Sequence, residues 1–233
     1  MYVQMKVVVK ISGKFISPID KPLVREYAKT LDQIIEEGHE LFVVVGGGSI
    51  ARKYIDLVNS NNFLKDLIGI EASRLNARAL AYTMKHSIKR IPESIDDLLK
   101  LYSLNFRKAI ISGGLQPGQS TNAVSLLIAE LVGAELVVNA TTVDALYDKP
   151  PSDPTAKKLL KVSYDEALRI LSSTQWKQEP GRYELFDLLS LHIAKRSKIP
   201  IAIVNGSDPL NVYNAIVKGY YGSLITNELS KEL

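Results

Sequence analysis

The sequence predicts a three-layer α/β sandwich, in which a mainly parallel sheet lies between two layers of helices. Two observations lead to this prediction. Short runs rich in β-branched residues alternate along the chain with longer segments whose apolar residues recur at helical spacing. Most of the short runs are apolar without interruption, which is typical of parallel strands buried on both faces.

The first half of the chain alternates between the two patterns. Apolar runs and helical periodicity predict, in order, strand 7–11, helix 23–37, strand 41–45 and helices 49–58, 63–84 and 95–101. Gly38 is expected to end the first of these helices, since a glycine commonly follows a helix C-terminus. Ser49 is expected to cap the second helix through its hydroxyl.

The second half continues the alternation as far as the C-terminus. The same criteria predict strand 109–112, helix 121–132, strand 135–140, helices 164–171 and 186–195, strand 199–205, helix 210–217 and a short closing strand 223–226. Residues 149–154 hold three prolines and are predicted to form a loop. No internal repeat and no clear linker divides the chain, so a single domain over residues 1–233 is expected.

Composition excludes several classes of site. The chain has no cysteine, which removes disulfides, thiolate nucleophiles and cysteine-bound metals. Its three histidines are far apart in the sequence, which argues against a histidine zinc site. The net charge of +4 is mild for a nucleic-acid-binding protein. We find no signal peptide and no apolar stretch of membrane-spanning length, so a cytoplasmic protein without nucleic-acid or membrane partners is expected.

Four predicted strands run into unusual turns, at residues 12–14, 46–49, 113–121 and 141–144. In open α/β sheets, ligands bind beyond the carboxyl ends of the strands. Glycine-rich turns expose main-chain N–H groups to an anion, and neighbouring lysines add positive charge. Several such turns at one edge predict a phosphate-bearing ligand. Neither a P-loop motif, nor a G-x-G-x-x-G motif, nor a G-x-S-x-G elbow is present.

These segments carry a resemblance to a known family. They read KISGK, VVVGGGSIARKYI, DLIGIEASRLNA, SGGLQPGQSTNAV and TTVDALY followed by DPTAKK. Their combination and order are similar to the amino-acid kinase superfamily, and within it to the archaeal type of uridylate (UMP) kinase. Weaker similarity continues to the terminal GSLI, so the resemblance covers nearly the whole chain.

The resemblance implies a fold, an activity and an assembly. The fold is expected to have a mainly parallel sheet of eight strands, with the monophosphate acceptor in an N-terminal lobe (about 1–135) and ATP in a C-terminal lobe (about 136–233). The implied reaction, with Mg²⁺, is ATP plus UMP giving ADP plus UDP, in pyrimidine biosynthesis. The implied assembly is a homohexamer, a trimer of dimers. Two alternatives remain: a related kinase for isopentenyl phosphate or carbamate, and a non-catalytic nucleotide sensor.

The resemblance also assigns the residues for catalysis. Lys10 matches the lysine that stabilises the transition state, and Gly13 and Lys14 are expected at the ATP phosphates. Gly47 is expected beside UMP and Gly48 beside ATP. Phosphoryl transfer needs positive charge and in-line positioning, which suits these lysines. The alternative for Lys10 is a surface lysine at a strand end.

Arg52 lies one helical turn beyond Gly48, which directs it toward the same phosphates, and it is assigned to catalysis and to ATP. Its alternative is a solvated arginine paired with Asp56. Thr141, Thr142 and Tyr147 are expected to line the ATP site, although Tyr147 could equally be a surface aromatic residue.

Asp66 and one loop are assigned to UMP. Asp66 resembles the aspartate that accepts hydrogen bonds from the ribose hydroxyls, which a carboxylate can do for both at once; its alternative is an aspartate placed to favour a helix N-terminus. The loop is expected to wrap the uracil and the acceptor phosphate through Leu115, Gln116, Pro117, Gly118, Gln119, Ser120 and Thr121. Its alternative is a turn before a capped helix.

Other positions depart from the family pattern or have open roles. Ala145 replaces a glycine, which would restrict the loop if that position needed a positive φ. Pro150 replaces an acidic residue near ATP, and Asn122 replaces an aspartate that can orient the catalytic lysine. Asp144 is expected to shape its loop or to help hold a magnesium shell. Asp187 is expected to be structural, and no residue is assigned as a direct metal ligand.

Overall fold

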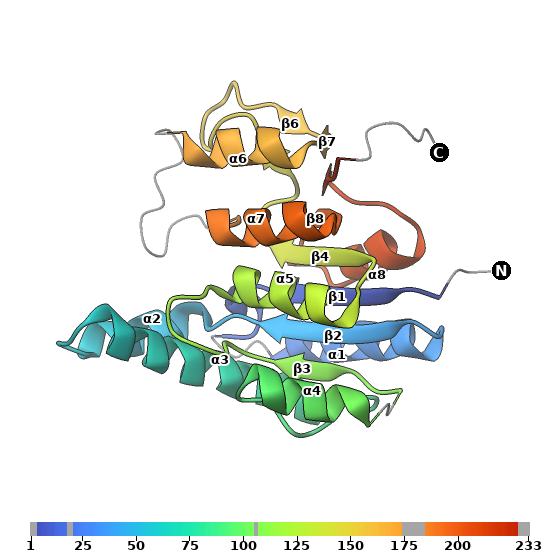
Figure 1. Ribbon diagram of the computed structural model, residues 1–233. Helices are drawn as coiled ribbons and strands as arrows, with labels where there is room; N and C mark the ends of the chain where they lie inside the picture. The colour runs from blue at the N-terminus through green and yellow to red at the C-terminus, as the bar shows by residue number, and fades with distance from the viewer. Residues whose placement is uncertain (1–3, 18–20, 105–106, 174–184, 228–233) are drawn as a thin grey trace.

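A seven-stranded sheet runs through the middle of the protein (Figure 1). The structure is a computed structural model that describes residues 4–17, 21–104, 107–173 and 185–227. The strand order is β3-β2-β1-β4-β8-β9-β7. The strands span β1 Lys6–Ile11, β2 Glu40–Val45, β3 Ile110–Ser112, β4 Leu136–Thr141, β7 Lys161–Val162, β8 Ile201–Asn205 and β9 Ser223–Ile225.

The five strands from β3 to β8 are parallel, so their carboxyl ends meet at one edge. Strand β9 runs antiparallel to β8, and β7 lies parallel to β9. The register places Lys10 of β1 between Val44 of β2 and Asn139 of β4. The middle of the sheet therefore carries a lysine at the edge where ligands of such folds bind.

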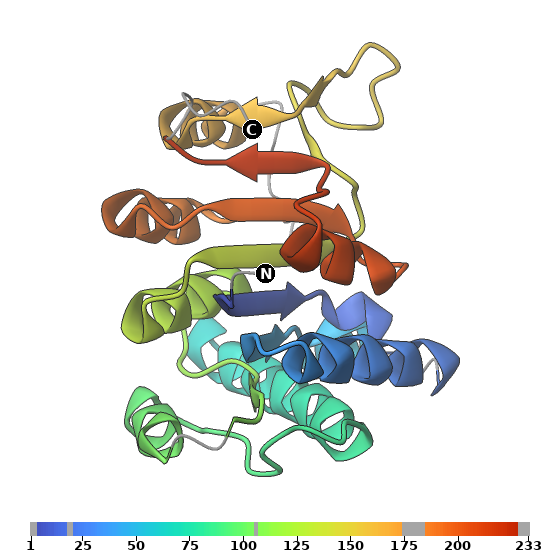
Figure 2. The ribbon, with the colours of Figure 1, turned by 90° about the vertical axis from the view of Figure 1, so that its right-hand side faces the viewer.

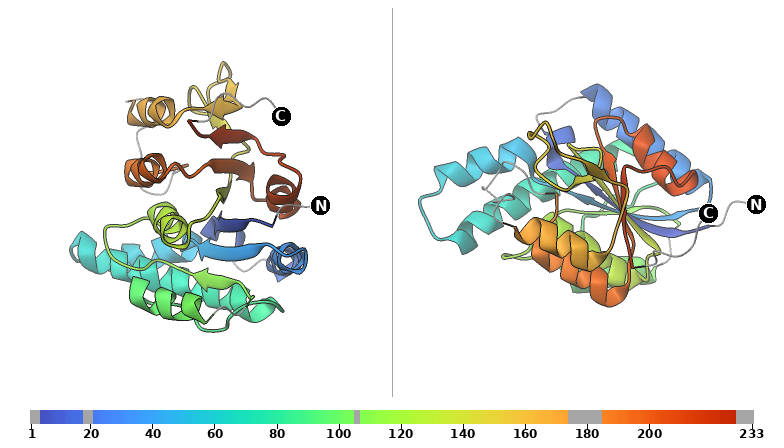
Figure 3. Two further views of the ribbon diagram at one scale, coloured as in Figure 1. Left: turned by 45° about the vertical axis from the view of Figure 1, so that its right-hand side comes forward. Right: turned by 90° about the horizontal axis from the view of Figure 1, so that it is seen from above.

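Helices cover both faces of the sheet, which gives the predicted three layers (Figure 2, and Figure 3, right). Their bounds are α1 Lys21–Glu36, α2 Gly48–Leu57, α3 Asn62–Thr83, α4 Ile95–Ser103, α5 Thr121–Val132, α6 Tyr164–Ser172, α7 Leu188–Ser197 and α8 Leu210–Val217. Helices α1, α3 and α8 share one core cluster with the sheet, and α4, α5, α6 and α7 share the other. Helix α2 and the start of α3 extend beyond the carboxyl ends of the strands (Figure 1).

Strand β1 shows why Lys10 faces the site and not solvent. Val7, Val9 and Ile11 pack into the core under α1, α3 and α8, whereas Val8 packs into the core under α5. Because side chains alternate along a strand, Lys10 shares the face of Val8 and points toward the α5 side. Only 6% of Lys10 is exposed, so the alternative of a surface lysine is wrong.

The structure confirms the predicted strands and helices, with ends shifted by a few residues at most, and it adds short pieces. These are the 3₁₀ turn η1 (Gly13–Phe15), strand β7, and a separate antiparallel pair, β5 (Leu146–Tyr147) with β6 (Lys158–Leu159). The main sheet of the described chain thus has seven strands and not eight. Each added strand is only two residues long, too short for a periodicity signal.

Two predictions concern the ends of helices, one at the start of α2 and one after α1. Ser49 lies inside α2 and donates from its hydroxyl to the carbonyl oxygen of Ser17 at 3.1 Å, so the prediction that it caps α2 is wrong. Gly47 holds the cap position instead, with no side chain to occupy the first N–H groups. Gly38 follows α1 with a φ of +98°, as expected of a glycine after a helix. No described helix is long and apolar enough to span a membrane.

Two glycine turns meet main chain to main chain at the ends of β1 and β2. A Cβ added to Gly13 would overlap the nitrogen of Gly48 and the carbonyl of Gly46, and one added to Gly48 would overlap the carbonyl of Gly13. Gly48 also has a φ of +68°, in the left-handed region. The two turns can approach this closely only because neither carries a side chain.

We expect Gly13→Ala to lower the free energy of unfolding by about 3 kcal/mol or more, because the new methyl group would overlap rigid main chain. Gly133→Ala is the matched control. Gly133 also has a positive φ, +65°, but a Cβ there would contact nothing within 4 Å, so we expect a loss of only about 1–2 kcal/mol. Urea unfolding of both variants measures this. Equal losses of unfolding free energy in the two variants would show that the close contact between the turns does not restrict which residue can occupy position 13.

Candidate functional site

A cavity of about 430 Å³ opens at the carboxyl ends of the parallel strands. The predicted site residues among those that line it are Lys10, Gly13, Lys14, Gly47, Gly48, Arg52, Asp66, Gln119, Ser120, Thr121, Thr141 and Thr142. They lie as far as 132 residues apart in the sequence, from position 10 to position 142. The cavity therefore joins the strand-end turns into one site.

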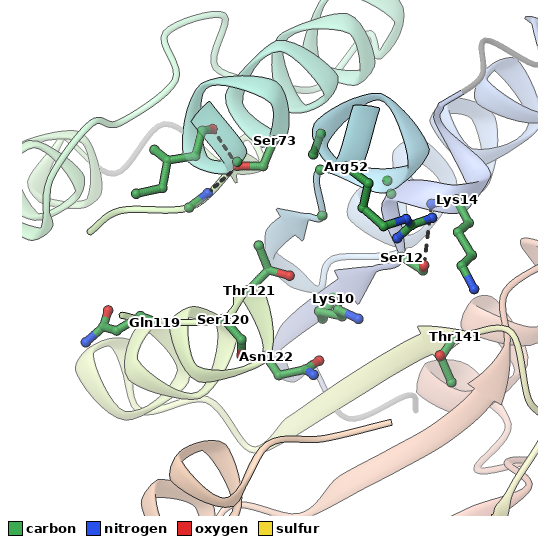
Figure 4. A pocket seen from close by; sticks show the side chains of 18 of the residues that line it. Lys10, Ser12, Lys14, Arg52, Ser73, Gln119, Ser120, Thr121, Asn122 and Thr141 are labelled. Atoms are coloured by element: carbon green, nitrogen blue, oxygen red, sulfur yellow. Dashed lines mark hydrogen bonds between the residues drawn. The ribbon is translucent and has the colours of Figure 1, made fainter. Parts of the chain in front are cut away.

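Three cationic side chains reach this cavity from different elements (Figure 4). Lys10 comes from β1, Lys14 from η1 and Arg52 from α2. Among the described residues that line the cavity, only Asp66 carries negative charge. Arg52 forms no ion pair with Asp56 in the described structure, so the alternative of an arginine paired on the helix surface is not supported. The cavity has a net positive charge that suits a polyanionic ligand.

Two helix N-termini add to this positive field. Helix α2 begins at Gly48, behind a cap position without a capping side chain, and Gly47 and Gly48 both line the cavity. Helix α5 begins at Thr121, which also lines it. The free N–H groups and the dipole of a helix N-terminus favour anions. Together with the cations, they make this a site for phosphate groups.

One face of α3 forms the wall opposite the sheet. Asp66, Gly69, Ile70 and Ser73 line the cavity, and their spacing of three, four and seven residues puts them on one side of the helix. Asp66 is the fifth residue of α3, beyond its first turn, and its Oδ2 accepts from the N–H of Gly118 at 2.8 Å. The alternative of an aspartate in the first turn is therefore wrong. The same helical spacing from Asp66 would have identified Gly69, Ile70 and Ser73, which the sequence analysis missed.

The loop expected to wrap the acceptor lies against α3. Leu115, Gln116, Pro117 and Gly118 do not line the cavity itself, whereas Gln119, Ser120 and Thr121 do. Ser120 caps α5 by accepting from the N–H of Ala123 at 3.0 Å, and its hydroxyl donates to Asp187. The loop is thus both a cavity wall and the entry to a capped helix.

Asp187 joins two helices beside the site. Its Oδ1 accepts from the N–H of Ser190 at 2.9 Å and so caps α7, while its other oxygen accepts from Ser120 at the start of α5. Asp187 does not line the cavity. These contacts agree with the structural role expected of it.

Tyr147 and Asp144 form a cluster outside the cavity. The Tyr147 hydroxyl donates to Asp144 at 2.8 Å, and Lys158 pairs with the same carboxylate from β6. Burial alone would raise the pKa of the Asp144 carboxyl, but these hydrogen bonds outweigh it and the pKa lies below its usual range. Asp144 therefore shapes the β5–β6 loop. Ala145 has no positive φ and is fully buried, so this position does not require a glycine.

Asn122 occupies the cavity wall with a buried oxygen that has no hydrogen-bond partner. It is 3% exposed. The hydrogen bond that would let Asn122 orient Lys10 is thus not formed through this oxygen. Buried polar atoms are almost always paired, so Asn122 Oδ1 is an unsatisfied acceptor in the wall of the cavity.

Relatives with known names match this chain along almost its whole length. The uridylate kinase of Ignicoccus hospitalis is 56% identical over 218 residues, which cover 94% of this chain and 97% of that protein. The uridylate kinase of Hyperthermus butylicus is 44% identical over 225 residues, with coverages of 94% and 97%. These matches confirm the resemblance inferred from the strand-end motifs.

Comparisons with solved structures and with protein families agree with the sequence relatives. The crystal structure of uridylate kinase from Archaeoglobus fulgidus superposes with a TM-score of 0.85 at 35% identity, covering 95% of this chain and 100% of that one. UMP kinase from Ureaplasma parvum shares the fold, with a TM-score of 0.78 at 18% identity and coverages of 97% and 100%. Residues 5–205 match the amino acid kinase family. Because this match covers most of the chain and every residue that lines the cavity, this chain belongs to the amino acid kinase family.

Proposed function

We propose that this protein transfers the γ-phosphoryl group of ATP to UMP, which gives ADP and UDP. The observation that carries the proposal is the convergence of Lys10, Lys14 and Arg52 with two helix N-termini on one cavity. The named relatives, uridylate kinases that match almost the whole chain, support the choice of UMP. The reaction places the protein in the synthesis of pyrimidine nucleotides.

The chain's own groups act by charge and position. As a phosphoryl group moves between two oxygens, negative charge is spread over its equatorial oxygens. Lys10, held by β1 with 6% exposure, would donate hydrogen bonds to those oxygens in a site that excludes most water. Lys14 and Arg52 would hold the donor phosphates, and the amides of Gly47 and Gly48 would lie between the donor and acceptor. No acid–base residue is required.

The acceptor belongs to the half of the cavity that α3 lines. Asp66 has a second carboxylate oxygen besides the one bound to Gly118, and it would accept from the ribose hydroxyls. The α5 N-terminus at Thr121 would receive the acceptor phosphate, while Gln119 lies beside it on the same wall. This supports an acceptor lobe over about residues 1–135.

The donor belongs to the half that lies beyond β4. Thr141 and Thr142 line the cavity at the end of this strand, next to the turn at Gly13 and Lys14. Tyr147 lies outside the cavity on β5, in the loop that Asp144 shapes, so we propose that it packs against the nucleoside and not against the phosphates. This supports a donor lobe over about residues 136–233.

Magnesium would enter with ATP. Mg²⁺ is usually bound through substrate phosphates, water and one or two protein oxygens. The described cavity offers a single carboxylate, that of Asp66, so the ATP phosphates and water would hold most of the metal's coordination positions. With ATP bound, the metal would neutralise negative charge on the transferring group.

We further propose a homohexamer built as a trimer of dimers and a cytoplasmic location, on the basis of the family. Kinases for isopentenyl phosphate or carbamate, and a nucleotide sensor, are the competing functions. A histidine at the cavity would favour isopentenyl phosphate, and no histidine is among the described residues that line it.

An assay of ADP release tests the function. We expect UMP to be phosphorylated at least tenfold more efficiently, by kcat/KM, than CMP, AMP, isopentenyl phosphate or carbamate, with ATP and Mg²⁺ present. Preference for another acceptor would replace UMP in the proposal. Tight nucleotide binding without turnover of any acceptor would favour the sensor.

Replacing Lys10 tests the transition-state role. We expect Lys10→Ala and the longer Lys10→Met to lower kcat at least tenfold without unfolding the protein, because the site loses a charge that acts on the moving phosphoryl group. Lys6→Met removes the same charge from the other end of β1, where Lys6 bonds Tyr102 and Val132. It should keep kcat near normal. Near-normal activity of both Lys10 variants would remove Lys10 from the mechanism.

Replacing Asp66 tests the ribose contact. Asp66→Asn keeps an acceptor for Gly118 but loses the charge, and hydrogen bonds to charged groups contribute about 1.5–3 kcal/mol. We therefore expect the Kd for UMP, measured by calorimetry, to rise about tenfold or more while the Kd for ATP stays the same. Asp56→Asn makes the same charge change on the exposed side of α2 and should alter neither constant. An unchanged UMP affinity in Asp66→Asn would refute the assignment.

A further inference from the structure

Arg74 of α3 binds main-chain carbonyls at the start of residues 114–121, here called the acceptor loop. Its Nε donates to the carbonyl oxygen of Gly114 at 3.2 Å, and its Nη2 lies 3.5 Å from that of Leu115. Nη2 also donates to the carbonyl oxygen of Glu93 at 2.7 Å, and Nη1 pairs with Glu71 at 2.8 Å. The side chain is 13% exposed. The guanidinium thus connects α3, the acceptor loop and the segment before α4.

These contacts determine which way two peptide groups of the loop face. A trans peptide is planar, with its C=O and N–H on opposite sides. Since the carbonyls of Gly114 and Leu115 turn toward Arg74, the N–H groups of Leu115 and Gln116 turn away from it. In the part of the chain that the structure describes, neither of these two N–H groups donates a hydrogen bond. The two residues lie between Gly114 and Gln119, which line the cavity, so their amides are unpaired donors beside it that a ligand could satisfy.

Helix α3 holds the rest of the loop at two more points. The N–H of Gly114 donates to Ser73 Oγ at 2.7 Å, and the N–H of Gly118 donates to Asp66 at 2.8 Å. Gly113 lies so close to the helix that an added Cβ would come within 2.6 Å of the main-chain nitrogen of Arg74. Among the described residues, only Arg74 binds carbonyls in this part of the loop, so it has the most direct effect on how the peptides that carry the free amides are turned.

We propose that Arg74 is a positioning residue for the acceptor: it orients the 114–116 peptides so that the amides of Leu115 and Gln116 are presented to UMP. The inference rests on the proposed function for the identity of the acceptor. Arg74 does not line the cavity and touches no reacting atom. Its effect is therefore on acceptor binding, and not on ATP or on the phosphoryl transfer itself.

The arrangement requires an arginine in particular. Its planar guanidinium offers five N–H donors in a fixed fork, which here serve carbonyls on two separate segments. A lysine has one flexible ammonium group and could not reach both the Gly114 and the Glu93 carbonyls in the same geometry. Arg74→Lys thus keeps the charge and loses the fork, whereas Arg74→Met loses both.

The test compares the two substrates in the full-length enzyme. We expect Arg74→Lys and Arg74→Met to raise the KM and the calorimetric Kd for UMP at least tenfold, with the KM for ATP within twofold of the parent. The control is Arg78→Met, one turn further along α3, where the side chain is exposed and forms no hydrogen bond in the described structure. This control variant should keep the KM values for UMP and for ATP within twofold of those of the parent. An unchanged KM for UMP, or equal losses for UMP and ATP, would overturn the proposal.

A measurement without substrate separates this inference from the proposed function. Amide hydrogen exchange of residues 113–119 in the ligand-free protein should become faster in both Arg74 variants and remain unchanged in Arg78→Met. If the parent enzyme uses another acceptor, the KM comparison is made with that acceptor. Unchanged exchange in the Arg74 variants would overturn the role of Arg74, whatever the acceptor is. Faster exchange in these variants, together with no binding of UMP by the parent, would refute only the assignment of UMP as the acceptor.

Discussion

The contact between the glycine turns after β1 and β2 is the constraint on which the rest of the site depends. Gly13 approaches the main chain of Gly46 and Gly48 too closely for any side chain. This contact places η1, with Lys14, directly beside the start of α2, with Arg52. Cationic groups from two strand-end segments can therefore face one cavity, and the uncapped α2 N-terminus points its free N–H groups at the same place.

The fold holds the cationic side chains of the cavity in position before a ligand binds. Lys10 is almost buried in the middle of a parallel sheet, where an ammonium group is costly to desolvate. The strands on each side fix its position, and α5 covers the face to which it points. A lysine held in this way loses little entropy when a phosphoryl group arrives, which is how a rigid site favours the transition state.

Most of the fold and the position of the phosphate site could be predicted from the sequence, because both depend on short-range sequence patterns. Uninterrupted apolar runs indicate strands buried on both faces, and helical spacing indicates helices, so nearly every element of the sheet and of its two covering layers was predicted to within a few residues. Glycine-rich strand ends with Lys10, Lys14 and Arg52 nearby indicated a phosphate site, since parallel strands must end at a common edge. The two-residue strands β5, β6 and β7 escaped because they are too short to show a period.

Only the tertiary structure decided which of these groups act together. Ser49, a good N-cap by residue type, bonds Ser17 instead, because α2 begins one residue earlier against the Gly13 turn. Ser73 and Arg74 lie in the segment DLIGIEASRLNA, but the sequence assigned neither a role, because their partners belong to a loop about 40 residues later that folds onto α3. Amino-acid sequence determines local conformation through side-chain shape and polarity. Contacts between distant segments depend on how the helices pack on the sheet, and that packing is set by the whole core.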